Sequence, residues 1–299
     1  MQQSLRGRRD QALRSWRQTR ALAREAQELT TSDLPQDMRD EVAKSMRVID
    51  RRSRVKSLPN PIEILGYSVS YFRDDDLRYL FNEIFVKGEY LFPADNERPK
   101  IVDCGSNIGL SILFFKRLYP QASIIAFEPD AETFSMLKRN IENNRISDVV
   151  LHNCALSDQD GEITFYRDAE NSGSPLMSTC NERLVGMPTK VTARRLSPFL
   201  VGTIDLLKVD VEGAEHSLMM DLVATGKLAS VRQIHMEYHH HIAGNTDRLS
   251  EMLRLFEDHG FGYQLRTASE KWPIPRSFWF SRWPAPCAFQ DISIFAYRK

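Results

Sequence analysis

Hydrophobic residues beyond position 99 form short, nearly continuous runs that alternate with helical patterns. Apolar runs without polar alternation are typical of strands buried on both faces, and helices between them predict a parallel sheet covered on each side. We expect strands at 100–104, 123–127, 149–154, 204–209, 231–238, 263–266 and 292–297, with helices at 108–118, 131–143, 214–225 and 248–259. The pattern therefore predicts a doubly wound α/β fold.

The preceding residues have a different pattern. Residues 1–30 are good helix formers, Pro35 interrupts them, and 36–54 are helical again until Pro59 and Pro61. Residues 62–72 then alternate as in a strand or hairpin, and 74–87 favour a helix. We divide the chain into a helical N-terminal extension, residues 1–60, and a main domain, residues 61–299. Loops at about 167–188 and 268–288 interrupt the alternation.

Charge is distributed unevenly along the chain. The whole sequence carries 40 basic and 40 acidic residues, but residues 1–60 hold 14 Lys and Arg against 8 Asp and Glu. A slightly acidic main domain is a poor general nucleic-acid binder, because phosphate contacts need clustered cations. The basic extension could contact RNA, anionic lipid or an acidic partner, but its sparse apolar positions favour a helical face that packs on its own domain.

Composition and cysteine usage indicate a reduced, globular protein. Hydrophobic residues make up 42% of the chain, and the longest apolar runs are far shorter than the ~20 residues of a transmembrane helix. The N-terminus lacks the apolar core of a secretory signal, and the four cysteines show no C-x-x-C spacing. We expect a cytoplasmic protein with no transmembrane segment.

A glycine turn at 101–109 follows one predicted strand and opens a helix. A dinucleotide site needs G-x-G-x-x-G, whereas here three residues separate Gly105 from Gly109, and Asp103 precedes them. A carboxylate there would repel a phosphate but attract a cationic amine or sulfonium. The next strand ends at Glu128, where a carboxylate can bind ribose hydroxyls. The turn therefore favours an adenosyl ligand without phosphates, which S-adenosylmethionine fits; the alternative is a tight turn with a buried Asp.

Residues 101–110, the triplet 127–129, the segment 153–158 and above all the segment 207–215 resemble the FkbM family of S-adenosylmethionine-dependent methyltransferases. The resemblance covers about residues 80–297. It implies a Rossmann-like class I methyltransferase fold, with a seven-stranded, mostly parallel sheet and a reversed last strand, and mostly O-methylation of secondary metabolites, sugars or glycolipids. The residues expected at the cofactor are Glu89, Tyr90, Asp103, Gly105, Ser106, Asn107, Gly109, Glu128, Pro129, Ala155, Leu156, Ser157 and Asp210.

Candidate catalytic residues lie where strands end, because ligands of open α/β sheets bind beyond the carboxyl ends of the strands. Asp210 ends one central strand, and Glu237 and His239 end its neighbour. We expect all three to converge on the transferable methyl. Glu237 or His239 would remove the acceptor proton, and Asp210 would hold the cofactor ammonium or orient an acceptor hydroxyl. Glu212 is expected at the acceptor or, with Glu215, as a cap of the following helix.

Three consecutive histidines, residues 239–241, raise a metal hypothesis. A set of two carboxylates and a histidine would suit a divalent ion. Successive residues of an extended strand face opposite ways, however, so the three histidines cannot bind one ion without a turn. We therefore expect no metal site. His235, in mid-strand, is expected to be a core histidine.

The loop at 268–288 combines prolines with the aromatic residues Trp272, Trp279 and Trp283. Rings held by prolines at the mouth of a site suit the face of a sugar or another apolar acceptor. Alternatively, the rings pack under the N-terminal helices or form a subunit interface, as in a homodimer.

The hypothesis favoured by these features is O-methyl transfer to a hydroxyl of a small-molecule acceptor: a sugar, a glycolipid or a polyketide-type secondary metabolite. One alternative is an RNA methyltransferase that uses the basic arm at 6–24 as a phosphate tether. The other is a non-catalytic binding module with the same fold. All the expected acidic positions are present, which favours an enzyme.

Overall fold

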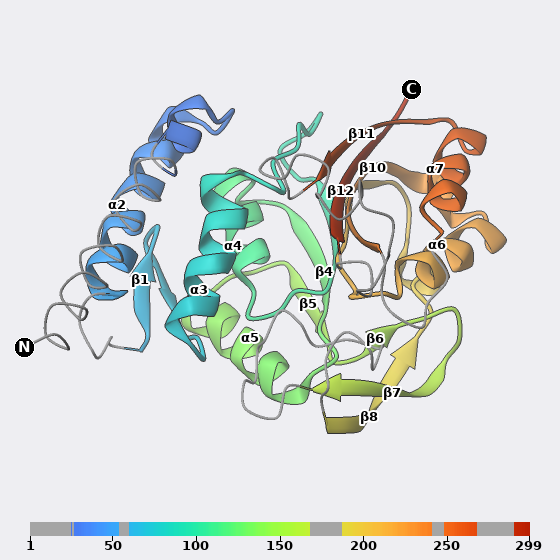
Figure 1. Ribbon diagram of the computed structural model, residues 1–299, viewed down its shortest axis with the longest axis horizontal. Helices are drawn as coiled ribbons and strands as arrows, with labels where there is room; N and C mark the ends of the chain where they lie inside the picture. Colours follow the sequence, from blue (N-terminus) through green and yellow to red (C-terminus); the bar gives the residue numbers. More distant parts are fainter. Residues whose placement is uncertain (1–24, 26, 54–59, 168–186, 241–247, 268–289) are drawn as a thin grey trace, which may run out of the picture.

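A seven-stranded sheet forms the centre of the computed structural model, which describes residues 25, 27–53, 60–167, 187–240, 248–267 and 290–299 (Figure 1). Its order is β11-β12-β10-β9-β3-β4-β5. The bounds are β3 Lys100–Cys104, β4 Ser123–Phe127, β5 Val149–His152, β9 Ile204–Val209, β10 Val231–His240, β11 Phe261–Thr267 and β12 Gln290–Arg298. Only β12 runs antiparallel to its neighbours within this sheet. The predicted mostly parallel sheet with a reversed last strand is confirmed.

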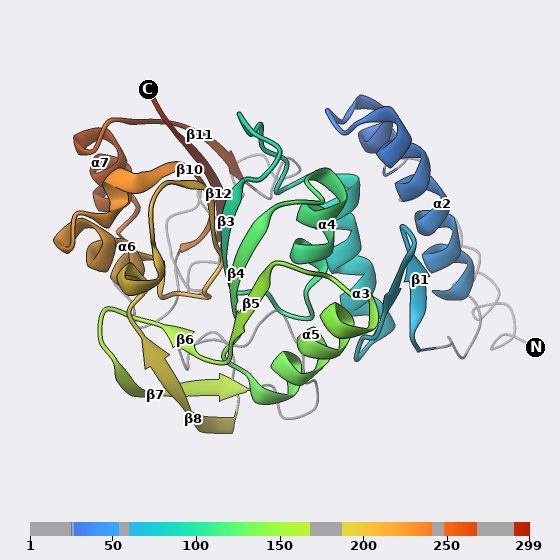
Figure 2. The same ribbon diagram turned by 180° about the vertical axis from the view of Figure 1, so that it is seen from behind.

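Helices cover both faces of this sheet (Figures 1 and 2). One face carries α3 (Asp74–Phe81), which continues as a π-helix (Asn82–Val86), together with α4 (Leu110–Leu118) and α5 (Ala131–Asn143). The other face carries α6 (Glu215–Ala224) and α7 (Leu249–Asp258). Alternate residues of a strand face opposite sides of the sheet and enter two hydrophobic cores. Ile101 lies in the first core, with α3, α4 and α5, and Val102 lies in the second core, with α6 and α7.

A second, three-stranded sheet was not predicted. It has the order β6-β8-β7, with β6 at Ala155–Leu156, β7 at Gly161–Arg167 and β8 at Met187–Arg194. The strand expected at 149–154 therefore ends at His152, where the chain leaves the main sheet. The strands β7 and β8 are mostly half-buried or exposed, so they lack the apolar run that marks a central strand. Short 3₁₀ helices at Ser197–Phe199 and Lys227–Ser230 precede β9 and β10.

The N-terminal helix α2 (Gln36–Ser53) packs against the first core. Met38 and Val42 are buried in it, and Arg117 of α4 forms ion pairs with Asp37 and Glu41 at 2.9 and 2.8 Å. These contacts hold α2 against the main domain. The basic arm at 6–24 lies outside the described residues. No helix in the described part of the chain is long and apolar enough to cross a membrane.

A hairpin of β1 (Ile62–Ile64) and β2 (Tyr67–Val69) lies between α2 and α3 (Figure 1). Asn140 of α5 and Asn144, the C-cap residue of this helix, bind the backbone of the hairpin. Asn140 accepts from the Ser70 amide and donates to the Ser70 carbonyl, and Asn144 makes the same pair of hydrogen bonds with Ser68. These side chains satisfy the backbone as a neighbouring strand would, and so fix the hairpin to the main domain.

Candidate active site

A pocket opens at the carboxyl ends of β3, β4 and β9. Its volume is about 700 Å³ when the solvent-open mouth is included. The residues that line it are Leu80, Gly105, Asn107, Phe127, Glu128, Pro129, Cys154, Ala155, Leu156, Phe165, Asp210, Val211 and Glu212. It therefore lies where an open α/β sheet binds its ligands.

The floor of the pocket is the glycine turn between β3 and α4. Gly105 has a φ of +89°, and a Cβ there would lie 1.9 Å from the Asp210 carbonyl oxygen. No other residue type fits, because the turn must approach the end of β9 closely. Gly109, with a φ of +91°, precedes α4, and its Cβ would meet Leu137 at 2.6 Å. The spacing of the two glycines thus follows from two separate close contacts.

Glu128 lies at the end of β4, in the pocket wall. Its side chain accepts hydrogen bonds from the Asn107 amide at 3.0 Å and the Asp130 amide at 2.9 Å. Burial raises the pKa of this carboxyl to about 8, and the two amide hydrogen bonds oppose that rise. A carboxyl with such a pKa can accept a hydrogen bond from a ligand hydroxyl and, when protonated, donate one.

Asp103 lies behind the pocket wall rather than in it. It is fully buried, accepts a hydrogen bond from the Ser111 hydroxyl at 2.6 Å, and forms an ion pair with Lys208 Nζ at 3.2 Å. Lys208 Nζ also donates to the Gly105 carbonyl at 2.6 Å and lies 3.5 Å from Asp210 Oδ2. Burial lowers the pKa of Lys208, but the charges of Asp103 and Asp210 outweigh burial and raise it. Asp103 therefore acts on the pocket through Lys208, not by lining it.

The remaining residues expected at the cofactor fall into two groups. Asn107, Pro129, Ala155 and Leu156 line the pocket. The others do not. Tyr90 packs under Lys208, whose Nζ lies 5.0 Å from the ring centroid. Glu89 forms an ion pair with Arg266, and Gly109 precedes α4. The hydroxyl of Ser106 donates to the Asp103 carbonyl, and the hydroxyl of Ser157 donates to Asp158.

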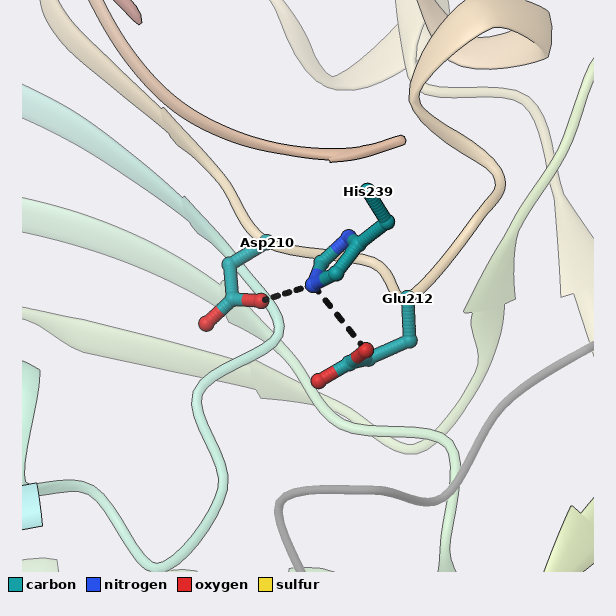
Figure 3. A group of neighbouring side chains, drawn as sticks. All are labelled: Asp210, Glu212 and His239. Atoms are coloured by element: carbon teal, nitrogen blue, oxygen red, sulfur yellow. Dashed lines mark ion pairs between the residues drawn. The ribbon is translucent and has the colours of Figure 1, made fainter. Parts of the chain in front are cut away.

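His239 is the centre of a cluster beside the pocket (Figure 3). Its side chain is fully buried, at the carboxyl end of β10. The Nε2 atom lies 3.1 Å from Glu212 Oε2 and 4.0 Å from Asp210 Oδ1. Glu237 Oε1 and Asp291 Oδ1 each lie 3.8 Å from the same nitrogen. The structure thus brings Asp210, Glu237 and His239 together, with Glu212 among them.

Glu215, the first residue of α6, fixes the opposite side of the imidazole. Its Oε1 lies 2.6 Å from His239 Nδ1 and accepts the Gly213 amide at 2.9 Å. One carboxylate therefore binds the turn before its own helix and also orients His239.

Sequence reasoning missed part of this site. Three residues of the pocket wall were not expected there. Leu80 belongs to α3, Phe165 belongs to the unpredicted strand β7, and Val211 lies in the turn after β9. Lys208 carried a usable signal, because a lysine inside an apolar strand needs a carboxylate, and Asp103 is its register partner on β3.

Two other expectations concern residues outside the pocket wall. His235 is buried against the Phe295 ring, with centroids 5.0 Å apart, and burial lowers its pKa to about 4, as suits a core histidine. The expected acceptor residues Trp272, Trp279 and Trp283 lie outside the described residues.

The sheet order, the reversed β12 and the pocket at the strand ends define a Rossmann-like methyltransferase fold. The family profile described as Methyltransferase FkbM domain matches residues 103–263. The chain belongs to the FkbM family of methyltransferases.

Named relatives agree with this family. "Methyltransferase 1" of Beauveria bassiana is 35% identical over 171 residues, which cover 49% of this chain and 68% of the relative. "Methyltransferase sdnD" of Sordaria araneosa is 32% identical over 193 residues, covering 54% and 74%. "31-O-demethyl-FK506 methyltransferase FkbM" of Streptomyces tacrolimicus is 29% identical over 238 residues, covering 68% and 87%.

Proposed function

We propose that this protein transfers a methyl group from S-adenosylmethionine to a hydroxyl of a small-molecule acceptor: a sugar, a glycolipid or a polyketide-type secondary metabolite. The observation that carries the proposal is the convergence of Asp210, Glu212, Glu237 and His239 beside a pocket whose far wall holds Glu128. The name of the relative from Streptomyces tacrolimicus, which specifies an O-demethyl substrate, supports transfer to oxygen.

The residues of the pocket fit the proposed cofactor. Glu128 would bind the ribose hydroxyls, since its buried carboxyl lies at the end of β4. Phe127, Leu156 and Phe165 offer apolar surface for the adenine. Asp210, in the wall and 22% exposed, would attract the cationic part of the ligand. The backbone of the glycine turn lines the pocket at Gly105, where a side chain would clash with the Asp210 carbonyl.

When bound, S-adenosylmethionine supplies a methyl group that its sulfonium has already activated. The task of this chain is then to align an acceptor oxygen and to take its proton as the new carbon–oxygen bond forms. We assign the proton to Glu237 or His239. Glu215 holds the imidazole of His239 through Nδ1 and directs Nε2 toward the pocket-lining carboxylates. Glu237, with 28% of its side chain exposed, can pass a proton on to solvent.

Labelled S-adenosylmethionine and an extract of the source organism test the proposal. The purified protein should label one small molecule, which mass spectrometry then identifies. Glu237→Gln and His239→Ala should each lower kcat, by about 10²–10⁴ for the residue that is the base, while calorimetry shows nearly unchanged cofactor affinity. Glu142→Gln, an exposed change on α5, is the control. Absence of cofactor binding would refute the proposed function, whereas full kcat in both variants would refute only the assignment of the base.

A further inference from the structure

The His239 cluster has the composition and spacing of a metal site. We propose that Asp210, Glu212 and His239 bind one divalent cation at the pocket wall. The binding site stands on geometry alone, and only the role of the ion rests on the proposed function. This set differs from the three consecutive histidines at 239–241, because its two carboxylates come from the turn after β9 and only His239 comes from β10.

Distances allow all three side chains to reach one ion. Ligand atoms about 2.0–2.3 Å from a metal lie no more than roughly 4.5 Å apart. His239 Nε2 lies 3.1 Å from Glu212 Oε2 and 4.0 Å from Asp210 Oδ1, and the three ligand atoms all lie within 4.8 Å of one another. Side-chain movements of a few tenths of an ångström therefore suffice. Figure 3 shows the carboxylates of Asp210 and Glu212 directed toward this nitrogen.

Glu215 prepares His239 for metal binding. A carboxylate can only accept a hydrogen bond, so a neutral imidazole donates to Glu215 from Nδ1 and presents the lone pair of Nε2 to the other carboxylates. Metal-bound histidines are commonly held by a second carboxylate in this way. Glu215 is itself only 2% exposed and anchored by the Gly213 amide, which makes the orientation rigid.

Electrostatics also favour a dication. Four carboxylates approach within 4.0 Å of one imidazole nitrogen: Asp210, Glu212, Glu237 and Asp291. Carboxylates held this close repel one another. Lys208 lies 3.5 Å from Asp210 Oδ2, and a divalent ion would add two positive charges and bind the carboxylate oxygens directly.

A second triad, Glu237, His239 and Asp291, shares the same nitrogen. One lone pair can bind one ion, so the two triads exclude each other. We assign the ion to Asp210 and Glu212 because both line the pocket, whereas Glu237 and Asp291 are not among its lining residues. The imidazole ligand favours a transition ion such as Mn²⁺ over Mg²⁺ and Ca²⁺, which are hard cations that prefer oxygen ligands.

An ion at this position would be open to the pocket. In the proposed reaction it would bind the acceptor oxygen and lower its pKa. His239 would then be a ligand, and Glu237 would receive the acceptor proton. This predicts that turnover falls after chelation and returns with Mn²⁺.

Mn²⁺ titration of the full chain, stripped with EDTA and followed by calorimetry, tests the site. One Mn²⁺ per chain should bind, and His239→Gln or Glu212→Gln should weaken it at least 10-fold. Glu215→Gln should weaken it about 10–100-fold. Asp291→Asn, which removes a nearby charge but no proposed ligand, should weaken binding less than Glu212→Gln. The remote Glu142→Gln should bind as the unaltered protein does, and circular dichroism confirms the fold of each variant.

The outcomes separate the two proposals. Absence of Mn²⁺ binding at millimolar concentration, in protein that still binds S-adenosylmethionine, would overturn the metal site alone. Loss of binding in Asp291→Asn with retention in Glu212→Gln would also overturn the assignment. Mn²⁺ binding without cofactor binding would refute the proposed function and leave the metal site standing.

Discussion

Replacement of Lys208 by methionine tests whether this buried cation stabilises the protein and the glycine turn of the pocket through its contacts with Asp103 and the Gly105 carbonyl. The methionine side chain is about as long and unbranched as that of lysine but carries no charge, so Asp103 stays buried without this ion pair. Removing one partner of a buried pair costs about 3–5 kcal/mol. Because domains are stable by only about 5–15 kcal/mol, we expect the melting temperature to fall by roughly 10 °C. The hydrogen bond to the Gly105 carbonyl is also lost, so cofactor affinity should fall as well.

The charges of Asp103 and Asp210 raise the pKa of Lys208, so this lysine is charged at both pH 5 and pH 8. A group with a raised pKa contributes stability that is lost only as the pH rises through that pKa. The loss of unfolding free energy in Lys208→Met should therefore be present at both pH values.

Urea unfolding followed by circular dichroism at both pH values measures these differences. The double variant Asp103→Asn with Lys208→Met should lose less stability than Lys208→Met, because neither charge remains. Lys138→Met, an exposed lysine of α5, is the control and should change stability by less than about 1 kcal/mol. A change within about 1 kcal/mol of wild type for Lys208→Met would refute the reasoning.

Three further changes test other parts of the structure. Glu128→Gln should weaken cofactor binding about 10-fold, as measured by calorimetry. Because burial raises the pKa of Glu128 from 4.5 to about 8, the unfolding free energy of the wild type should fall as the pH rises across that interval, and the variant should show a smaller fall. Gly105→Ala should abolish cofactor binding through its clash with Asp210, whereas Gly66→Ala, also at positive φ but with open space, should lose only about 1 kcal/mol in urea. Asn140→Ala should cost about 2–3 kcal/mol, and a loss below 1 kcal/mol would contradict its role in holding the hairpin.

The main sheet was predictable because its central strands are buried on both faces. All six residues of β9 are buried and four of them are apolar, so the strand forms a nearly continuous apolar run that only Asp205 and Lys208 interrupt. The rule that ligands bind at carboxyl strand ends then placed Asp210, Glu237 and His239 at one edge. The strands β7 and β8 were missed because they belong to a small, partly exposed sheet, where local composition resembles that of a loop.

Contacts that depend on tertiary packing could not be predicted from local pattern. Glu215 begins a helix and Asp291 lies on the antiparallel β12, and only the fold brings both to His239. The carboxylate of Asp103 was expected to face a ligand, because nothing in the sequence around it shows that it forms an ion pair with Lys208. The register of β3 with β9 decides that contact.

The position of β12 between β10 and β11 ties the site to the edge of the sheet. Within the described sheet, β11 pairs only with β12, so it joins β10 only through that strand. Asp291 lies on β12, opposite His239 of β10. Separation of β12 from β10 would therefore detach β11 from the sheet and at the same time remove one carboxylate from the His239 cluster.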